Sequence, residues 1–255
     1  MPDSAQPSVA LVTGAGRGIG AAVARRLSAE GMRVALSARS TDELEETAAA
    51  CPGETLVVPD DMTDPDAPDC IFASIEERWA PVDVLVANAG AGVSASLART
   101  TDEQWQQMLD LNLTAPFRCI RRAVPAMVER GRGRIVVVAS VAAKSGEPYI
   151  AAYTASKHGV LGLVRSAAVE LATTGVTVNA VCPGYVDTPM TDATVAGIVE
   201  RTGRTGDEAR RILERKQPIG RLITAAEVAD AVWFCIANPA VTGQGINVDG
   251  GAVQS

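Results

Sequence analysis

The chain has 255 residues, of which 47% are hydrophobic and 21% are charged. This length and composition predict one compact α/β domain over residues 1–255 and disfavour a second full domain. The 30 acidic and 23 basic residues give a net charge of -7, which argues against nucleic acid or an anionic membrane as a partner and favours small-molecule chemistry.

Short β-branched runs alternate along the chain with alanine- and leucine-rich stretches of helical spacing. This alternation predicts a Rossmann-type, doubly wound parallel sheet with helices on both faces. The strand runs are almost continuously apolar, as expected for strands that helices cover on both sides. We expect seven strands, at residues 8–13, 33–38, 55–59, 82–87, 134–140, 176–181 and 244–248, and helices that include 21–30, 40–50, 102–130 and 150–173.

The segment before Val9 carries no lysine or arginine, and the apolar run that follows it is too short for a signal-peptide core or a membrane span. We therefore expect a cytoplasmic protein. The five cysteines are irregularly spaced without a CxxC pair, which predicts reduced thiols. With His158 as the single histidine and no cluster at ligand spacing, we expect no metal site.

A glycine-rich segment, Thr13–Gly20, follows the first predicted strand and runs directly into a predicted helix. Glycines let a backbone turn tightly and approach a pyrophosphate, and the helix N-terminus offers free N–H groups and a positive dipole end. This context favours a dinucleotide-binding loop over a merely structural turn. The predicted contacts are Gly14, Arg17, Gly18, Ile19 and Gly20.

The end of the second predicted strand indicates which dinucleotide is bound. An acidic residue there would bind the ribose 2′-hydroxyl of NAD(H), whereas this chain has Arg39 followed by Ser40. Arg39 can bind a 2′-phosphate, and Arg17 can add a second positive charge. NADP(H) is therefore favoured over NAD(H); the alternative is that Arg39 is an ordinary solvated arginine.

Tyr153 and Lys157 lie one turn apart on the same face of a predicted helix. A neighbouring ammonium group favours the phenolate, so we expect Lys157 to lower the pKa of Tyr153 toward the working range of an acid/base catalyst. Ser140 ends an apolar strand run and should emerge at the carboxyl edge of the sheet, where ligands bind in open α/β folds. Taken alone, the Tyr/Lys pair could be an ordinary surface pair.

Together, these motifs and their order resemble the short-chain dehydrogenase/reductase family from Val9 to Gly251, with similarity to β-ketoacyl-ACP reductases and polyketide ketoreductases. Two departures are visible. Ala87 stands where the family usually has asparagine before Asn88, and Ala91-Gly92-Val93 replaces the Pro-Gly-Gly typical of the polyketide enzymes. The motifs are Thr13-Gly14-x-x-x-Gly18-x-Gly20, Asp61, Asn88-Ala89-Gly90, Asn112, Ser140, Tyr153 with Lys157, and Pro183-Gly184.

The resemblance implies hydride transfer between a nicotinamide and a ketone/alcohol pair, with Tyr153 as general acid/base. It also implies that Ser140 binds the substrate oxygen, that Lys157 holds the ribose and tunes Tyr153, and that Asn112 anchors a water relay. For the cofactor, it implies Asp61 at the adenine amine, Asn88 near the adenine-side ribose, and the backbone of Val186 at the nicotinamide carboxamide. The remaining implied cofactor contacts are Met62, Ala89, Gly90, Tyr153, Lys157, Pro183, Gly184 and Thr188.

Residues 188–221, polar and helix-prone, interrupt the alternation between the last two predicted strands, and we expect them to form a small helical lid. Their basic residues could bind the phosphates of a CoA or phosphopantetheine arm, but interspersed acids favour a solvated helix with i,i+4 ion pairs. We expect the substrate to be a ketone, either a β-keto thioester or a cyclic, polyketide-like ketone. The candidate pocket residues are Val93, Val141, Tyr149, Tyr185 and Met190, and Tyr149 could equally be a packing aromatic.

Two other functions remain open from the sequence. An NAD-dependent catabolic alcohol or 3-hydroxyacyl-CoA dehydrogenase would use the same catalytic residues, and Arg39 disfavours it. A non-catalytic dinucleotide-binding module would keep the glycine loop but would not need Ser140, Tyr153 and Lys157 together. The resemblance also implies a homotetramer.

Overall fold

The computed structural model describes residues 8–254 and contains a seven-stranded sheet in the order β3-β2-β1-β4-β5-β6-β7, with every neighbouring pair parallel. The strand order reverses between β1 and β4, which is the switch point where ligands bind in this class of sheet. The predicted fold class is confirmed. The strands are β1 (Val9–Thr13), β2 (Arg33–Ser37), β3 (Thr55–Val57), β4 (Val84–Ala87), β5 (Gly133–Val138), β6 (Val176–Pro183) and β7 (Gly245–Val248).

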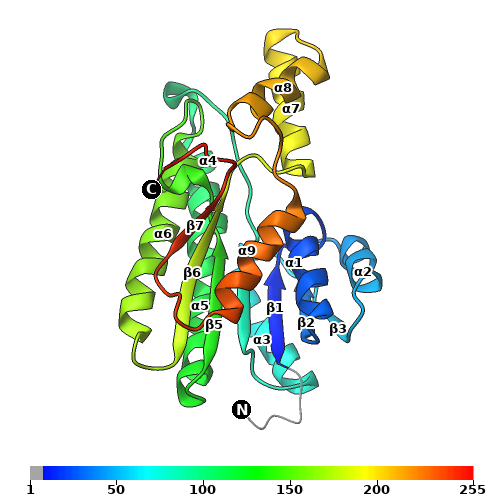
Figure 1. Ribbon diagram of the computed structural model, residues 1–255, viewed down its shortest axis with the longest axis vertical. Helices are drawn as coiled ribbons and strands as arrows, with labels where there is room; N and C mark the ends of the chain where they lie inside the picture. The colour runs from blue at the N-terminus through cyan, green and yellow to red at the C-terminus, as the bar shows by residue number, and fades with distance from the viewer. Residues whose placement is uncertain (1–7, 255) are drawn as a thin grey trace.

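Helices cover both faces of the sheet, and two further helices project beyond the carboxyl ends of the strands (Figure 1). On one face α1 packs against α9, and on the other α5 packs against α3 and α6. No helix of residues 8–254 is both long enough and apolar enough to cross a membrane. The helices are α1 (Gly18–Ala29), α2 (Thr41–Ala49), α3 (Ala67–Arg78), α4 (Asp102–Leu109), α5 (Ala115–Glu129), α6 (Ala151–Leu171), α7 (Pro189–Thr202), α8 (Gly206–Arg215) and α9 (Ala225–Ala237).

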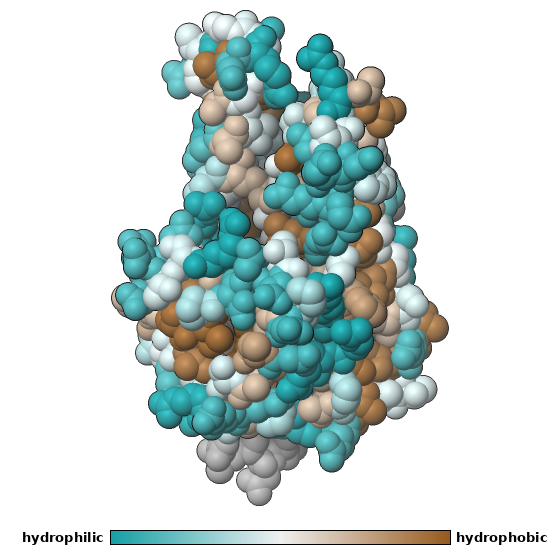
Figure 2. All heavy atoms as spheres, turned by 180° about the vertical axis from the view of Figure 1, so that it is seen from behind, coloured by the Kyte–Doolittle hydropathy of each residue, from teal (hydrophilic) through white to brown (hydrophobic). Residues whose placement is uncertain are grey.

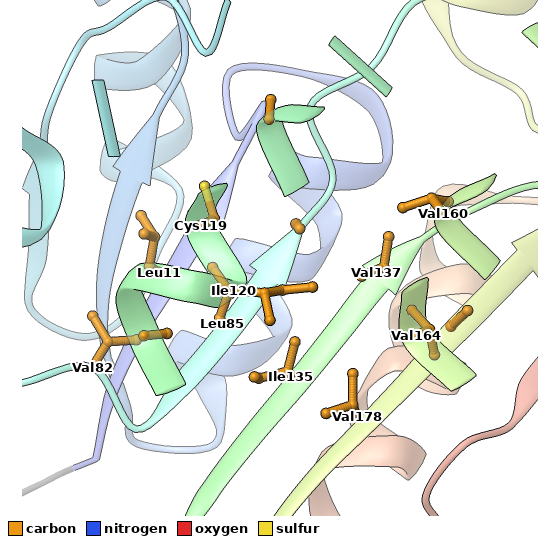
Figure 3. Packing of buried hydrophobic residues seen from close by; sticks show 14 of the residues in the cluster. Leu11, Val82, Leu85, Cys119, Ile120, Ile135, Val137, Val160, Val164 and Val178 are labelled. Atoms are coloured by element: carbon orange, nitrogen blue, oxygen red, sulfur yellow. The ribbon is translucent and has the colours of Figure 1, made fainter. Parts of the chain in front are cut away.

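The buried core divides into two clusters, one on each face of the sheet. Leu11 belongs to the cluster under α3, α5 and α6, whereas its neighbour Val12 belongs to the cluster under α1 and α9. Successive strand side chains point to opposite faces, so both must be apolar when both faces are covered. In Figure 3, Ile135 and Val137 of β5 line the first cluster beside Val164 of α6.

The expected helix 102–130 is interrupted in its middle. A π-helical turn, η2 (Asp110–Thr114), separates α4 from α5 and places Asn112 in a buried position. π-helical turns insert an extra residue per turn and are frequent at functional sites. Hydrophobic periodicity did not predict this turn, because a π-helical turn shifts the register of a helix without ending the helix.

Other element boundaries also differ from the sequence predictions. The first helix starts at Gly18 rather than Ala21, and β5 ends at Val138, two residues before Ser140. The insertion 188–221, called the lid segment below, contains α7 and α8, joined at Gly203, which has a φ of 68°. Glycine is the residue that tolerates this left-handed conformation at a helix end.

Candidate active site

The glycine loop between β1 and α1 closes tightly on itself. Gly14 and Gly18 have φ values of 64° and 56°, and a Cβ on Gly20 would collide with the carbonyl oxygen of Gly14. The side chain of Arg17, the N-cap of α1, does not cap the helix, so it leaves the first N–H groups of α1 without a side-chain partner. The loop therefore has the close backbone approach and the positive helix end that suit a pyrophosphate.

Asn88 braces this loop from the end of β4. Its Nδ2 donates to the carbonyl oxygens of Thr13 at 2.9 Å and Gly14 at 3.1 Å, and its backbone N–H donates to Thr13 Oγ1 at 3.0 Å. The backbone N–H of Ala89 donates to the same hydroxyl at 3.0 Å. Asn88 therefore forms its hydrogen bonds with the glycine loop. These bonds do not require the asparagine that the family usually has at position 87, where this chain has alanine.

At the end of β2, Arg39 is exposed and makes no ion pair with any of residues 8–254. Arg17 is different, because its guanidinium lies 3.1 Å from the Glu43 carboxylate. Ser40 caps α2 by accepting a hydrogen bond from Glu43 N at 3.3 Å. Arg39 therefore offers a free positive charge for a phosphate, while the charge of Arg17 is already partly balanced.

Asp61 lies on the exposed loop after β3, beside the buried Met62. Its Oδ1 accepts hydrogen bonds from Thr63 N at 2.9 Å and Thr63 Oγ1 at 2.8 Å. These bonds, with a smaller contribution from the charge of Arg39, hold the pKa of Asp61 below its usual value. The carboxylate is thus fixed in its ionised form near the end of β2, where it can accept hydrogen bonds.

Asn112 joins the loop after β4 to helix α6. Its Oδ1 accepts from Ala91 N at 3.1 Å, while its Nδ2 donates to Ala91 O at 3.0 Å and to Ser156 Oγ at 3.2 Å. Ser156 in turn donates to the carbonyl oxygen of Tyr153 at 2.7 Å. At 1% exposure the amide needs these partners, and it links the loop to the turn that carries Tyr153.

Ser140, Tyr153 and Lys157 come together at the carboxyl edge of the sheet. Lys157 Nζ lies 5.6 Å from the centroid of the Tyr153 ring and donates to the carbonyl oxygen of Val138 at 3.0 Å. Ser140 follows β5, and its Oγ accepts from Ala142 N at 3.1 Å. Gly90 lies against the same group, since a Cβ there would come 2.9 Å from Asn112 Oδ1 and 3.6 Å from Lys157 Nζ.

The pKa of Tyr153 differs from the sequence expectation. Burial raises the pKa of this phenol above its ordinary value, and a hydrogen bond with Ser140 opposes that shift. Burial also lowers the pKa of Lys157 to about 8. The expectation of a lowered tyrosine pKa was wrong for this structure, because desolvation of the phenolate is the larger effect.

The segment after β6 reaches back to the glycine loop. Pro183 ends β6, and Val186 is buried and forms a β-bridge with Ile223. The side chain of Thr188 lies close to Gly18, because a Cβ on this glycine would come 3.2 Å from Thr188 Cγ2. The two predicted ends of the dinucleotide site therefore border one another at Gly18 and Thr188. Gly184 packs against the buried Asp249.

The predicted pocket residues lie on three loops and on α7. Val93 follows β4, Val141 starts the turn after Ser140, and Tyr185 precedes the lid segment. Met190 on α7 is half exposed. Figure 2 shows the upper end of the molecule divided between the lid segment and the opposite loops, with apolar side chains in the hollow between them.

Tyr149 is not a packing aromatic, because 64% of it is exposed. It has a φ of 70° and is the single residue other than glycine with positive φ among residues 8–254. Its carbonyl oxygen accepts from Ala95 N at 2.8 Å, which holds the loop before α6 against the loop after β4. A strained conformation of this kind persists only where its surroundings fix it, and such residues cluster at functional sites.

The contacts of three residues near this site were not predicted from the sequence. Glu147 and Lys216 pair with each other and with Tyr185, and the buried Gln217 binds the backbone of Tyr185. No motif marks them, because they meet only through the fold. Among residues 8–254, no group of three or more His, Cys, Asp or Glu side chains is arranged to hold a metal ion.

Comparison with known proteins gives consistent relatives. A protein assigned as a ketoacyl reductase of Streptomyces coelicolor is 41% identical over 95% of this chain and 96% of its own length. A 3-oxoacyl-[acyl-carrier-protein] reductase of Synechocystis is 39% identical over 96% of each chain. A crystal structure of an actinorhodin polyketide ketoreductase variant with NADPH superposes with a TM-score of 0.93 at 41% identity, covering 96% of this chain and 97% of that one.

The family profile described as short chain dehydrogenase matches residues 8–198, from β1 into α7. The departure at Ala91-Gly92-Val93 does not separate this chain from the ketoacyl reductases, since they are among its relatives at about 40% identity. The profile covers β1 to β6 and the start of the lid segment, and the relatives and the solved structure extend over 95% or more of the chain. The chain belongs to the short-chain dehydrogenase family.

Proposed function

We propose that this protein is an NADP(H)-dependent ketoreductase that interconverts a ketone and a secondary alcohol, with Tyr153 as the acid/base. The observation that carries the proposal is the convergence of Ser140, Tyr153 and Lys157 at the carboxyl edge of β5, beside the glycine loop. The relatives support the reaction class, since both curated sequences are named as reductases of ketoacyl groups.

The residues present fit a nicotinamide dinucleotide. The glycine loop and the N-terminus of α1 would hold the pyrophosphate, and Asp61 would accept a hydrogen bond from the adenine amine. Lys157 would hold the nicotinamide ribose, and the backbone of Val186 would bind the carboxamide. The further contacts of this proposal are Met62, Ala89, Gly90, Pro183, Gly184 and Thr188.

The choice of NADP(H) rests on Arg39. It is exposed and unpaired at the end of β2, where no carboxylate of the strand tip opposes a 2′-phosphate. The solved ketoreductase with NADPH, which covers 96% of this chain, supports the same choice. Ser40 is next to Arg39 and caps α2, so its hydroxyl is close to this phosphate site.

The protein groups handle the proton in the reaction. In reduction, Ser140 Oγ donates a hydrogen bond to the ketone oxygen, and Tyr153 Oη transfers its proton to that oxygen as the alcohol forms. NADPH, when bound, supplies the hydride that reduces the carbonyl carbon. The raised pKa of Tyr153 suits this direction, because a proton donor must hold its proton at neutral pH.

Lys157 and Asn112 support this step in different ways. Lys157 places a buried positive charge beside the phenol, which favours the phenolate left after proton transfer. Asn112 fixes the loop after β4 against α6. The water relay that the family resemblance implies for Asn112 stays a prediction.

The substrate in this proposal is a β-keto thioester or a cyclic, polyketide-like ketone, bound under the lid segment of a single domain. Val93, Val141, Tyr149, Tyr185 and Met190 would surround it. The names of the relatives support a ketoacyl thioester. We further propose a homotetramer, in which the exposed apolar residues of α5 and α6 are buried between chains.

The proposal is tested by following NADPH and NADH oxidation with a panel that contains acetoacetyl-CoA, cyclohexanone and 2-decalone. We expect reduction of at least one ketone, with NADPH preferred. No turnover of any member would contradict the ketoreductase assignment. Preference for NADH would contradict the role of Arg39 and favour a catabolic alcohol dehydrogenase.

A further inference from the structure

Three side chains outside the proposed catalytic group form a cluster beside it. Tyr185 Oη lies 3.0 Å from both carboxylate oxygens of Glu147 and donates to that carboxylate. Lys216 forms an ion pair with Glu147, and its Nζ lies 3.4 Å from Tyr185 Oη and 5.4 Å from the centroid of the Tyr185 ring. We call Glu147, Tyr185 and Lys216 the clasp.

The clasp connects segments that are far apart in the sequence. Tyr185 lies just before the start of the lid segment, and Lys216 lies near its other end, directly after α8. Glu147 belongs to the loop that leads into α6, the helix of Tyr153. The ion pair of the clasp therefore joins the lid segment to the loop before the proposed catalytic helix.

The buried amide of Gln217 fixes the base of the same arrangement. Its Oε1 accepts from Tyr185 N at 2.9 Å, and its Nε2 donates to Tyr185 O at 3.2 Å and to Arg221 O at 2.6 Å. The backbone of Tyr185 is thus held by Gln217, while its hydroxyl is held by Glu147. The orientation of this ring depends on both contacts.

The other ion pairs of the lid segment do not make this connection. Arg210 pairs with Asp187, Asp192 and Glu214, all on or next to α7 and α8. Within residues 8–254, the Lys216–Glu147 pair is the one ionic contact between the lid segment and the loop before α6. Its loss would leave that side of the lid held by weaker contacts.

Tyr185 lies two residues beyond the end of β6, which pairs with β5, the strand that leads to Ser140. Its hydroxyl binds Glu147, which lies on the loop between Ser140 and Tyr153. Burial raises the pKa of the Tyr185 phenol, so the phenol stays protonated as the donor to Glu147. Because the Tyr185 hydroxyl is bound to Glu147, the ring cannot turn away from this loop without breaking that hydrogen bond. A ring held at its backbone and at its hydroxyl can act as a fixed wall.

We propose that Glu147 and Lys216 are positioning residues that hold Tyr185 as a wall of the substrate site and so limit the size of ketone that reaches Tyr153. This inference rests on the proposed ketoreductase function. It makes the clasp a determinant of substrate selectivity, acting without contact between Glu147 or Lys216 and the reacting atoms.

The test compares Glu147→Gln with the matched control Glu54→Gln. Glu54 pairs with Arg33 and Arg78, away from the lid segment. With NADPH, the ratio of kcat/KM for 2-decalone over cyclohexanone should rise about 2- to 5-fold in Glu147→Gln, the range expected for one exposed ion pair. The ratio should stay unchanged in Glu54→Gln.

A second readout does not depend on turnover. The lid segment contains several arginines, and trypsin should cut it about 2- to 5-fold faster in Glu147→Gln than in the wild type or in Glu54→Gln, because one anchor of the lid is lost. Lys216→Met should raise the selectivity ratio as Glu147→Gln does, and the double variant should change it no further than either single variant.

These readouts separate the possible failures. If no ketone is reduced by the wild type, the proposed function fails, while the trypsin rates still test the clasp. Faster cleavage with unchanged selectivity would overturn the selectivity assignment. Unchanged cleavage in Glu147→Gln would overturn the clasp itself, whether or not selectivity changes.

Discussion

Arg39 is the residue on which the cofactor choice depends. Arg39→Asp places a carboxylate where the proposal puts the 2′-phosphate, so it should repel NADPH and accept the 2′-hydroxyl of NADH. We expect the NADPH over NADH preference in kcat/KM to fall at least about 10-fold, corresponding to about 1.4 kcal/mol. Arg25→Asp on α1 is the charge-matched control, and an equal fall in both variants would contradict a specific role of Arg39.

Lys157 gives a pH dependence whose sign follows from its burial. Its pKa is about 8 in the folded chain against 10.5 for the ordinary group, so between these values the unfolded chain binds the proton and the folded chain does not. Stability therefore rises with pH through this window, by up to about 3 kcal/mol from this group. Below pH 8, where Lys157 is charged in both states, its burial lowers the free energy of unfolding by the same amount of about 3 kcal/mol.

The measurement is the free energy of unfolding in urea between pH 7.5 and 10 for the wild type and Lys157→Met. The variant should lack the rising contribution, so that the difference between the two curves changes across the window. Parallel curves would show that the pKa of Lys157 is not lowered by burial.

At the scale of single residues, the sequence identified the groups but not all of their partners. Ser140, Tyr153 and Lys157 lie together at the carboxyl edge of the sheet, because an apolar strand run leads to Ser140 and helical spacing puts Tyr153 and Lys157 on one face of α6. The contacts of Asn88 with Thr13 and the pairing of Arg17 with Glu43 depend on neighbouring elements. Their residue types alone do not specify those partners.

Among the elements, the π-helical turn η2 shows how a local irregularity serves the site. It places Asn112 where one amide reaches both Ala91 and Ser156, which come from different segments. The sequence predicted one continuous helix over 102–130 that contains Asn112, but not the altered turn. The lid segment is helical, as predicted. The predicted i,i+4 ion pairing of its charged residues is seen for Arg210 with Glu214. Arg210 and Lys216 also form ion pairs with residues outside α8.

Asn112→Ala should destabilise the fold, because it leaves the N–H and carbonyl groups of Ala91 without their side-chain partner. We expect a loss of about 2 to 4 kcal/mol in the free energy of unfolding, measured in urea. Gln106→Ala, which removes an exposed hydrogen bond to Asp110 on the same stretch, should change it by less than about 0.5 kcal/mol. Equal effects would contradict the bracing role of Asn112.

For the whole molecule, the sheet was the most predictable feature. Seven apolar runs separated by helical stretches are compatible with few folds other than a doubly wound sheet. Parallel strands need crossover connections, and right-handed crossovers place helices on both faces of the sheet. The boundaries were less certain: residues up to Pro183 belong to β6, beyond the predicted end at Val181. The end of a strand depends on its pairing with neighbouring strands, and here β6 extends to Pro183 because it pairs with β7. Hydrophobic periodicity does not reveal such pairing.

The proposed homotetramer belongs to this scale. Val169 on α6 is 81% exposed, and Phe117 and Val128 on α5 are each about 40% exposed, so the single chain leaves apolar side chains on these helices in water. Size-exclusion chromatography with light scattering should give four chain masses for the wild type and a smaller species for Val169→Glu. A wild-type protein that runs as one chain mass at all concentrations would contradict the assembly.

The account as a whole depends on Tyr153 as the proton donor. Its central test is Tyr153→Phe, measured as the kcat of NADPH-dependent ketone reduction together with the Kd of NADPH by fluorescence. We predict that kcat falls by at least about 10²-fold, the usual contribution of a general acid, while the Kd changes by less than about 3-fold. A variant that keeps most of the wild-type rate would contradict the assignment of Tyr153.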